Sequence, residues 1–180
     1  ITAEDIGTTV DDMNWIAQST RHVTGTSPDR GGSGDPSPYT ALGTFEGIRA
    51  CVRTALGREE PKGLRAAVQG AGSVGMEVCR LLHEAGVRLT VSDLSPERLA
   101  LARKRFGADE ASPERIYDAE SDLFVPCAFG AILNDQTIPR LKCRIVAGSA
   151  NNQLAEERHG RALAGRNILY APDYAINAGG

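Results

Sequence analysis

The stretch Leu64–Gly75, LRAAVQGAGSVG, decides the fold class. Its first half is a short apolar run typical of a buried strand, and its second half carries glycines in a G-x-G-x-x-G spacing at 70–75. Glycine makes up 20 of the 180 residues, so this spacing alone is weak. The context strengthens it, because the motif opens a predicted helix over 73–85 and Asp93 closes the next apolar run about twenty residues further on. The stretch therefore indicates a dinucleotide-binding unit.

Each residue of the motif has a physical task in that interpretation. Gly70 lets the chain turn sharply off the strand, and Gly72 lets a pyrophosphate approach a backbone without a side chain. Gly75 lets the helix pack close to the strand. Ser73 and Val74 begin the helix, whose free N–H groups and positive dipole end attract phosphate. The competing interpretation is a glycine-rich turn that binds nothing.

Asp93 points to the kind of nucleotide. A carboxylate at the end of the second strand accepts hydrogen bonds from ribose hydroxyls and repels a 2′-phosphate, which favours NAD over NADP. Arg98 lies five residues further on and is the one nearby cation that argues the other way.

The remaining pattern alternates short apolar runs with helical stretches. A helix is predicted from Ser37-Pro38 to about Gly57 and another from Pro96 to Phe106, because each begins with a hydroxyl cap and a proline in the first turn. Further strands are predicted in 87–93, 122–128, 143–150 and 167–173. The expected fold is α/β, a Rossmann-type, doubly wound, mainly parallel sheet with helices on both faces. A short amphipathic helix is predicted over 8–22, before the Gly/Pro/Ser-rich linker 27–38.

Composition excludes several classes. The chain has 20 basic and 23 acidic residues and a net charge of −3, so we expect no nucleic-acid partner. No apolar run approaches the roughly 20 residues of a membrane helix, and the N-terminus lacks the features of a signal peptide. The four cysteines form no CxxC pair, so we expect no metal site and reduced, mostly buried thiols in a cytoplasmic protein. His159 is expected on the surface and His83 partly buried.

Longer motifs then point to a family. They are ITAEDIGTTVDDM (1–13), SGDPSPYTALGTFEGIRA (33–50), VQGAGSVG (68–75), VPCAFGAILND (125–135), AGSANNQLAEERHG (147–160) and YAPDYAINAGG (170–180). Together they resemble the amino acid dehydrogenases of the Glu/Leu/Phe/Val family, especially its leucine dehydrogenase branch, over essentially the whole chain.

The resemblance implies an NAD-dependent oxidative deamination of a small apolar L-amino acid, of the leucine or branched-chain type, to its 2-oxo acid and ammonia. It implies two domains with the active site in the cleft between them. Residues 1–34 would end the substrate domain and form the hinge, and residues 35–180 would belong to an NAD-binding Rossmann domain that continues beyond them. It also implies a homo-oligomer in the full-length form.

The resemblance assigns roles at the reacting end. Asp5, in TAED, resembles the catalytic aspartate that passes protons as the imino intermediate forms and breaks down, which suits general acid–base chemistry. Ala3 would line the substrate pocket. Asn151 resembles the asparagine between the nicotinamide ribose and the substrate. Without the resemblance, Asp5 would pass for an ordinary turn residue and Asn151 for a helix cap.

Three more residues are assigned to the cofactor. Thr40 resembles the threonine that hydrogen-bonds the nicotinamide amide, and Cys127 and Ala128 resemble strand-end residues that line the cofactor ribose. By themselves, Thr40 would be a threonine on a helix face and Cys127 a small buried residue. The strand-end position of Cys127, Ala128 and Asn151 also favours a ligand site, since open parallel sheets bind ligands there.

None of the lysines Lys62, Lys104 and Lys142 fits the catalytic lysine that the resemblance implies. That lysine is expected upstream of Ile1, so residues 1–180 alone are expected to give no turnover. Two alternatives stay open, namely a regulatory or sensor protein that binds NAD without catalysis and an aromatic amino acid dehydrogenase of the same family.

Overall fold

The computed structural model describes residues 1–5 and 7–179, which form two compact units, Ile1–Pro38 and Tyr39–Gly180. The first unit contains helix α1 (Val10–Ile16) and the 3-10 turn η1 (Pro28–Arg30). Thr9 begins α1 in a capping box, in which the Thr9 backbone N–H donates to the Asp12 carboxylate at 2.8 Å. The predicted helix over 8–22 is thus too long, because the segment after Ile16 is rich in serine and threonine, which are poor helix formers.

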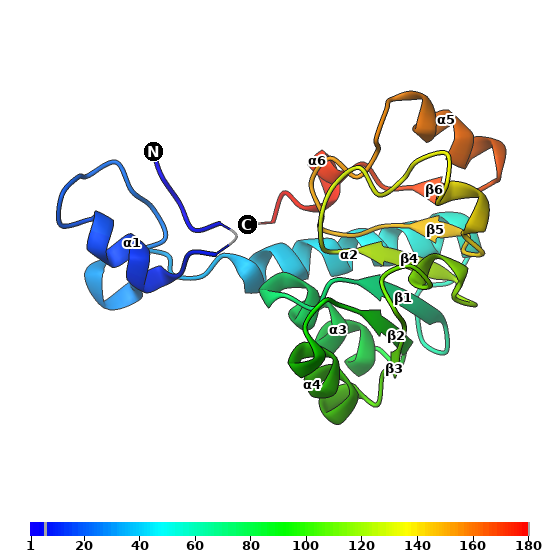
Figure 1. Ribbon diagram of the computed structural model, residues 1–180, viewed down its shortest axis with the longest axis horizontal. Coiled ribbons are helices and arrows are strands. Elements are labelled where there is room, and N and C mark those ends of the chain that lie inside the picture. Colours follow the sequence, from blue (N-terminus) through cyan, green and yellow to red (C-terminus); the bar gives the residue numbers. More distant parts are fainter. Residues whose placement is uncertain (6, 180) are drawn as a thin grey trace. The chain divides into compact units, whose positions relative to one another are not determined.

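The second unit is built on a six-stranded sheet, drawn as arrows in Figure 1. All strand pairs are parallel, in the order β3-β2-β1-β4-β5-β6. The strands are β1 (Arg65–Gln69), β2 (Arg88–Ser92), β3 (Asp109–Glu110), β4 (Leu123–Pro126), β5 (Ile145–Val146) and β6 (Leu169–Tyr170). This is the strand order of the doubly wound dinucleotide-binding fold, so the predicted fold class is confirmed.

The helices of this unit are α2 (Ser37–Leu56), α3 (Ser73–Glu84), α4 (Pro96–Phe106), α5 (Arg158–Gly165) and α6 (Asp173–Ile176). Two 3-10 turns, η2 (Ile116–Asp118) and η3 (Ile138–Arg140), complete it. Ser95 caps α4 by accepting the Arg98 backbone N–H at 3.3 Å, and Gly107 ends it in the left-handed conformation. Among the residues described, no helix is both long and apolar enough to cross a membrane.

Alternate side chains of the strands enter two separate cores, because successive strand residues point to opposite faces. On β1, Ala66 and Val68 pack with buried residues of α2, α3 and α4. Ala67 lies between them in sequence but belongs to the second core, with Phe124 of β4 and Leu163 of α5. Helices therefore cover both faces, as predicted.

The structure corrects several boundaries. The strands predicted in 143–150 and 167–173 shorten to two residues each, and β3 was not predicted, because Asp109 and Glu110 are charged and exposed. The connection between β4 and β5 holds the short turn η3 where a longer helical stretch is expected. His83 is exposed, although its ring lies 5.6 Å from that of Phe106, so the expected partial burial is wrong.

Candidate functional site

The glycine motif lies where the sheet changes its direction of winding. Chain order runs outward from β1 to β2 and β3, then returns to β4 on the other side of β1. Parallel strands end at the same edge, so the segments after β1, β2, β4 and β5 meet there. The crevice beside this switch point is where open α/β sheets bind ligands.

Gly70 and Gly75 are required by close packing. Gly70 follows β1 with a φ of +97°, and a Cβ on it would lie 2.8 Å from the Ala128 Cβ. A Cβ on Gly75 would lie 2.1 Å from the carbonyl oxygen of Gly70. Side chains are therefore excluded at both positions by the protein itself, and the turn after β1 can pass directly into α3.

Gly72 differs from Gly70 and Gly75, because no closely packed atoms surround the position that its Cβ would take. A Cβ there would meet only the Arg98 guanidinium, at 4.0 Å. Gly72 is the N-cap of α3 and makes no side-chain cap, so the N–H groups of Ser73 and Val74 in the first turn have no intrahelical acceptor. Open space beside free N–H groups at a helix start suits a phosphate, and these residues fit a dinucleotide.

Asp93 has a structural task in addition to its expected one. One carboxylate oxygen accepts the Ala71 backbone N–H at 2.6 Å, and the other accepts the Ser95 N–H at 2.9 Å. Its side chain is only 9% exposed. The carboxylate therefore joins the glycine turn to the segment after β2 through two hydrogen bonds. The hydroxyl groups of a bound ribose would donate to the lone pairs that remain on the Asp93 oxygens.

Arg98 lies near this carboxylate, with Nη1 at 3.8 Å from Asp93 Oδ1. The arginine side chain is 55% exposed, so its attraction for Asp93 is screened by water. Its guanidinium borders the same open space as Gly72. A cation there attracts the pyrophosphate of either nicotinamide cofactor, so the arginine does not by itself indicate NADP.

Cys127 and Ala128 follow β4 and contact the glycine turn. The Cys127 backbone N–H donates to Gln69 O at 2.7 Å, which joins the ends of β1 and β4. Burial raises the pKa of the Cys127 thiol, so the group is a neutral thiol that suits packing more than nucleophilic chemistry.

Asn151 lies in the segment after β5, exposed and six residues before Glu157, the N-cap of α5. It therefore caps no α-helix. Its side-chain Oδ1 accepts a hydrogen bond from the Asn177 amide at 2.5 Å. Sequence reasoning missed Asn177, because α6 has only four residues and no apolar periodicity to reveal it.

Thr40 lies half-buried in the first turn of α2, where its carbonyl accepts the Thr44 hydroxyl at 2.8 Å. The segment 176–179 packs against this part of α2. A Cβ on Gly47 would lie 2.5 Å from Ile176 Cγ1, and one on Gly43 would lie 3.1 Å from the Gly179 Cα. Two glycines on α2 thus bring the α6 region close to the helix that carries Thr40.

Asp5 and Ala3 belong to the first unit, and both are exposed. Asp5 begins a tight turn in which its N–H donates to Thr8 Oγ1 and the Thr8 hydroxyl donates to Asp5 O, both at 2.8 Å. The Thr8 hydroxyl group therefore fixes the backbone of Asp5 through its N–H and its carbonyl oxygen. Burial and the carboxylates of Asp35 and Asp12 raise the pKa of the adjacent Glu4 carboxyl.

The expectation that His159 lies on the surface is wrong, because the residue is only 1% exposed. Its Nδ1 accepts the Glu156 backbone N–H at 2.9 Å, so in the neutral ring the proton is on Nε2, 3.4 Å from Asp135 Oδ1. These three side chains are close enough to hold a metal. However, Nε2 has no free lone pair in this tautomer, and Arg158 already pairs with both carboxylates. We therefore assign no metal to this cluster.

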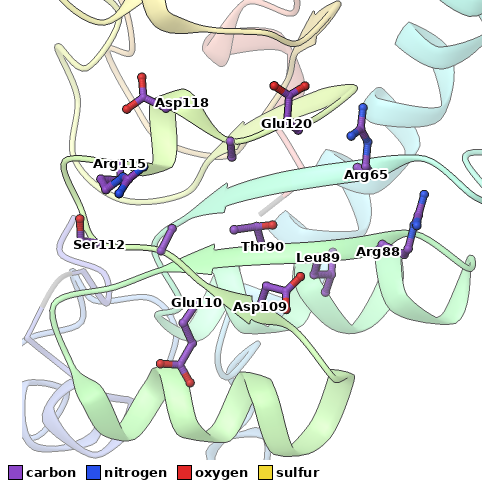
Figure 2. A pocket seen from close by; sticks show the side chains of 12 residues that line it. Arg65, Arg88, Leu89, Thr90, Asp109, Glu110, Ser112, Arg115, Asp118 and Glu120 are labelled. Atoms are coloured by element: carbon purple, nitrogen blue, oxygen red, sulfur yellow. The ribbon is translucent and has the colours of Figure 1, made fainter.

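A cavity of about 530 Å³ lies elsewhere, lined by residues of β1, β2 and β3 and by the segment 111–120 (Figure 2). Arg65 and Arg88, the first residues of β1 and β2, are paired in register and both line it. Arg65 pairs with Asp122 at 3.7 Å, and Glu120, also in the lining, pairs with Lys142 at 2.6 Å. The lining residues of this cavity include neither the glycine motif nor Asp93, so we do not assign the nucleotide to it.

The buried thiols lead to a testable prediction. Burial raises the pKa of Cys143 from 9.0 to about 11, so about a hundredfold less thiolate is present at pH 8 than for an unshifted thiol. We expect iodoacetamide to label Cys143 in the native protein at pH 8 at least about 100-fold more slowly than in urea. Half-buried Cys51 is the internal control and should react sooner. Mass spectrometry of timed samples measures both, and equal rates at Cys143 with and without urea would contradict the prediction.

The family model for Glutamate/Leucine/Phenylalanine/Valine dehydrogenase matches residues 95–180. Leucine dehydrogenase of Thermoactinomyces intermedius is 55% identical over 180 residues, which is all of this chain and 49% of that protein. The chain belongs to the Glu/Leu/Phe/Val dehydrogenase family. Members of this dehydrogenase family use NAD or NADP.

Other proteins similar to this chain are named for different substrates. L-tryptophan dehydrogenase of Nostoc punctiforme is 48% identical over 181 residues. The crystal structure of L-tryptophan dehydrogenase from Nostoc punctiforme matches with a TM-score of 0.83 at 45% identity, covering all of this chain and 51% of that one. The hetero-hexameric glutamate dehydrogenase of Thermus thermophilus, at 24% identity, a TM-score of 0.80 and coverage of 100% and 48%, shares the fold. The chain spans about half the length of the curated relatives it matches.

Proposed function

We propose that the protein containing this chain catalyses the NAD-dependent oxidative deamination of a small apolar L-amino acid, of the leucine or branched-chain type. The products are the 2-oxo acid, ammonia and NADH. The observation that carries the proposal is the open space at Gly72, beside free N–H groups of α3 and the Asp93 carboxylate. Identity of 49–55% to leucine dehydrogenases over the whole chain supports the substrate class.

The side chains then divide the work. Residues 35–180 form the NAD-binding domain, in which Gly70, Gly72, Ser73, Val74 and Gly75 hold the pyrophosphate. NAD, when bound, accepts a hydride from the substrate Cα. In this assignment the second unit is the part of the chain that binds the nucleotide.

The nicotinamide end is assigned to other segments of the same unit. Thr40 binds the nicotinamide amide, Cys127 and Ala128 border its ribose, and Asn151 contacts both that ribose and the substrate.

Residues 1–34 belong to the substrate domain and carry two assigned residues. Ala3 lines the pocket with a small apolar side chain, which suits leucine, valine or phenylalanine. Asp5 passes protons as water adds to the imino carbon and ammonia leaves. The full-length protein is a homo-oligomer.

Preference for NAD over NADP rests on Asp93. Its charge, held at the end of β2 by two backbone N–H groups, opposes a 2′-phosphate, whereas the Arg98 guanidinium is exposed and can rotate away. Since Asp93 also supports the turn, its replacement by alanine would leave two N–H groups without acceptors. Wild-type cofactor preference is therefore a cleaner measure than that variant.

The test is NADH formation by the full-length protein with L-leucine, L-valine, L-phenylalanine, L-tryptophan and L-glutamate, each with NAD and with NADP. We expect the highest kcat/KM with leucine or valine and NAD, and at least about tenfold less with NADP, the result of roughly 1.4 kcal/mol of repulsion. Highest activity with tryptophan or phenylalanine would instead identify an aromatic amino acid dehydrogenase, the class of the Nostoc punctiforme relative. No turnover together with intact NADH binding would identify a nucleotide-binding regulatory protein.

A further inference from the structure

A buried glutamine stabilises the segment after β5 through hydrogen bonds to backbone carbonyls of the same segment. Gln153 is fully buried, and its Nε2 donates to Gly148 O at 2.8 Å and to Ala150 O at 2.9 Å. A Cβ on Gly148 would lie 2.3 Å from Pro126 O, so the segment also leaves β5 in close contact with the end of β4. Residues 148–153 are thereby held in one shape.

The same segment is held from outside by α6. The Asp173 carboxylate accepts the backbone N–H of Asn152 at 2.7 Å, and Asn152 has a φ of +50°, a conformation that asparagine tolerates better than most residues. Asn177, the C-cap of α6, donates from Nδ2 to Asn151 Oδ1 at 2.5 Å and to Ser149 O at 3.4 Å. The α6 segment is itself fixed, because Ile176 is buried against Gly47 of α2.

Two acceptors determine which way these amides face. The backbone carbonyl of Ser149 can only accept, so the Asn177 atom that faces it is the amide nitrogen. The Asn151 atom that meets this nitrogen is then the amide oxygen. Consequently the NH₂ group of Asn151 faces away from α6, and no hydrogen bond from it to another described residue is found. Asn151 is exposed, so this NH₂ is available to a ligand.

An asparagine can present either an acceptor or a donor, and its neighbour selects which. We propose that Asn177 is a positioning residue that turns the Asn151 amide so that its NH₂ donates to an oxygen of the bound ligands. This rests on the proposed function, in which Asn151 lies between nicotinamide ribose and substrate. The acceptor is a ribose hydroxyl or the substrate carboxylate. Disturbing the Asn151 amide should lower the affinity for NADH only if the ribose hydroxyl is the acceptor.

The decisive variant is Asn177→Asp in the full-length protein. A carboxylate cannot donate, so the Asn151 amide turns to direct its NH₂ at the new carboxylate and its oxygen at the ligand. The ligand oxygen then loses the hydrogen bond from the Asn151 NH₂ group and faces the Asn151 oxygen instead. This change corresponds to about a 10- to 100-fold loss of affinity or of kcat/KM. We expect that loss in kcat/KM for the amino acid if the substrate carboxylate is the acceptor, and in NADH affinity if the ribose is. Asn177→Ala, which lets the amide rotate freely, should lose less.

A double-mutant cycle distinguishes positioning from general support. In an Asn151→Ala background, Asn177→Asp should change both quantities less than about twofold, because its effect passes only through Asn151. Asn167→Asp, an equal charge change at an exposed asparagine after α5, is the control and should match the wild type. Thermal unfolding monitors the fold of every variant.

Two outcomes would overturn the inference. One is an equal effect of Asn177→Asp with and without Asn151, which would show general support of the α6 region. The other is no effect in the presence of Asn151. If the wild type turns over no amino acid, the proposed function fails. NADH affinity of the wild type, Asn177→Asp, Asn151→Ala and the double variant then tests positioning toward the ribose, which equal affinities in all four proteins would overturn.

Discussion

Asp5→Asn in the full-length protein is expected to lower kcat by about 10²- to 10⁴-fold, the usual contribution of a positioned acid–base group. Asparagine has nearly the same shape but cannot exchange a proton. The turn around Asp5 should survive, because Thr8 Oγ1 bonds the backbone N–H and carbonyl of residue 5 and not its carboxylate. The effect is expected on turnover, and thermal unfolding of the variant checks that the fold is retained.

Affinity for NADH should stay within about twofold of the wild type, since additivity holds for independent sites and the glycine motif belongs to the other compact unit. Asp11→Asn is the matched control, with the same chemical change at an exposed residue in the first turn of α1. Steady-state kinetics with the best substrate and fluorescence titration with NADH measure both quantities. Unchanged turnover in Asp5→Asn would remove Asp5 from the proton-transfer role.

Two glycines three residues apart should respond to substitution in opposite ways. Gly72 has φ −69° and ψ −167°, which valine adopts easily, and its Cβ position is open. We expect Gly72→Val to fold like the wild type but to bind NADH about 100-fold more weakly, because the side chain fills the space assigned to the pyrophosphate; this is about 2.8 kcal/mol of binding free energy.

Gly75→Ala should instead destabilise the fold. The new Cβ would lie 2.1 Å from Gly70 O, so α3 must move away from the end of β1. We expect a loss of about 3 kcal/mol in the free energy of unfolding, as for overpacked cores. Urea denaturation and NADH titration of both variants make the comparison. Wild-type NADH affinity in Gly72→Val would show that no phosphate lies at the start of α3.

The fold class could be predicted because strong local signals agreed with one another. The run 64–69, the glycine motif and Asp93 each follow from backbone chemistry that acts within a few residues. What failed was set by contacts between distant segments. His159 lies among charged neighbours in sequence, yet it is one of the buried residues of α5. Asn177 gains its partner, Asn151, only because α2 has glycines where Ile176 and Gly179 approach.

The site residues divide in the same way. Spacing and strand-end position place the glycines, Asp93, Cys127 and Ala128 at one edge of the sheet. Nothing local indicates that both oxygens of Asp93 would already accept backbone N–H groups. That second duty depends on how the turn after β1 meets the turn after β2, a register that only the assembled sheet defines.

The position of β4 beside β1 also has a consequence for the order of folding. Strand β2 pairs with β1 after a single helix, but the β1–β4 contact joins residues as far apart as Arg65 and Asp122, 57 positions along the chain. Closing so long a loop costs more chain entropy, and contacts of high sequence separation slow folding. The switch point between β1 and β4 does not exist until this closure occurs. A nascent chain is therefore expected to form its glycine turn early. It can bind a nucleotide only after β4 has paired with β1.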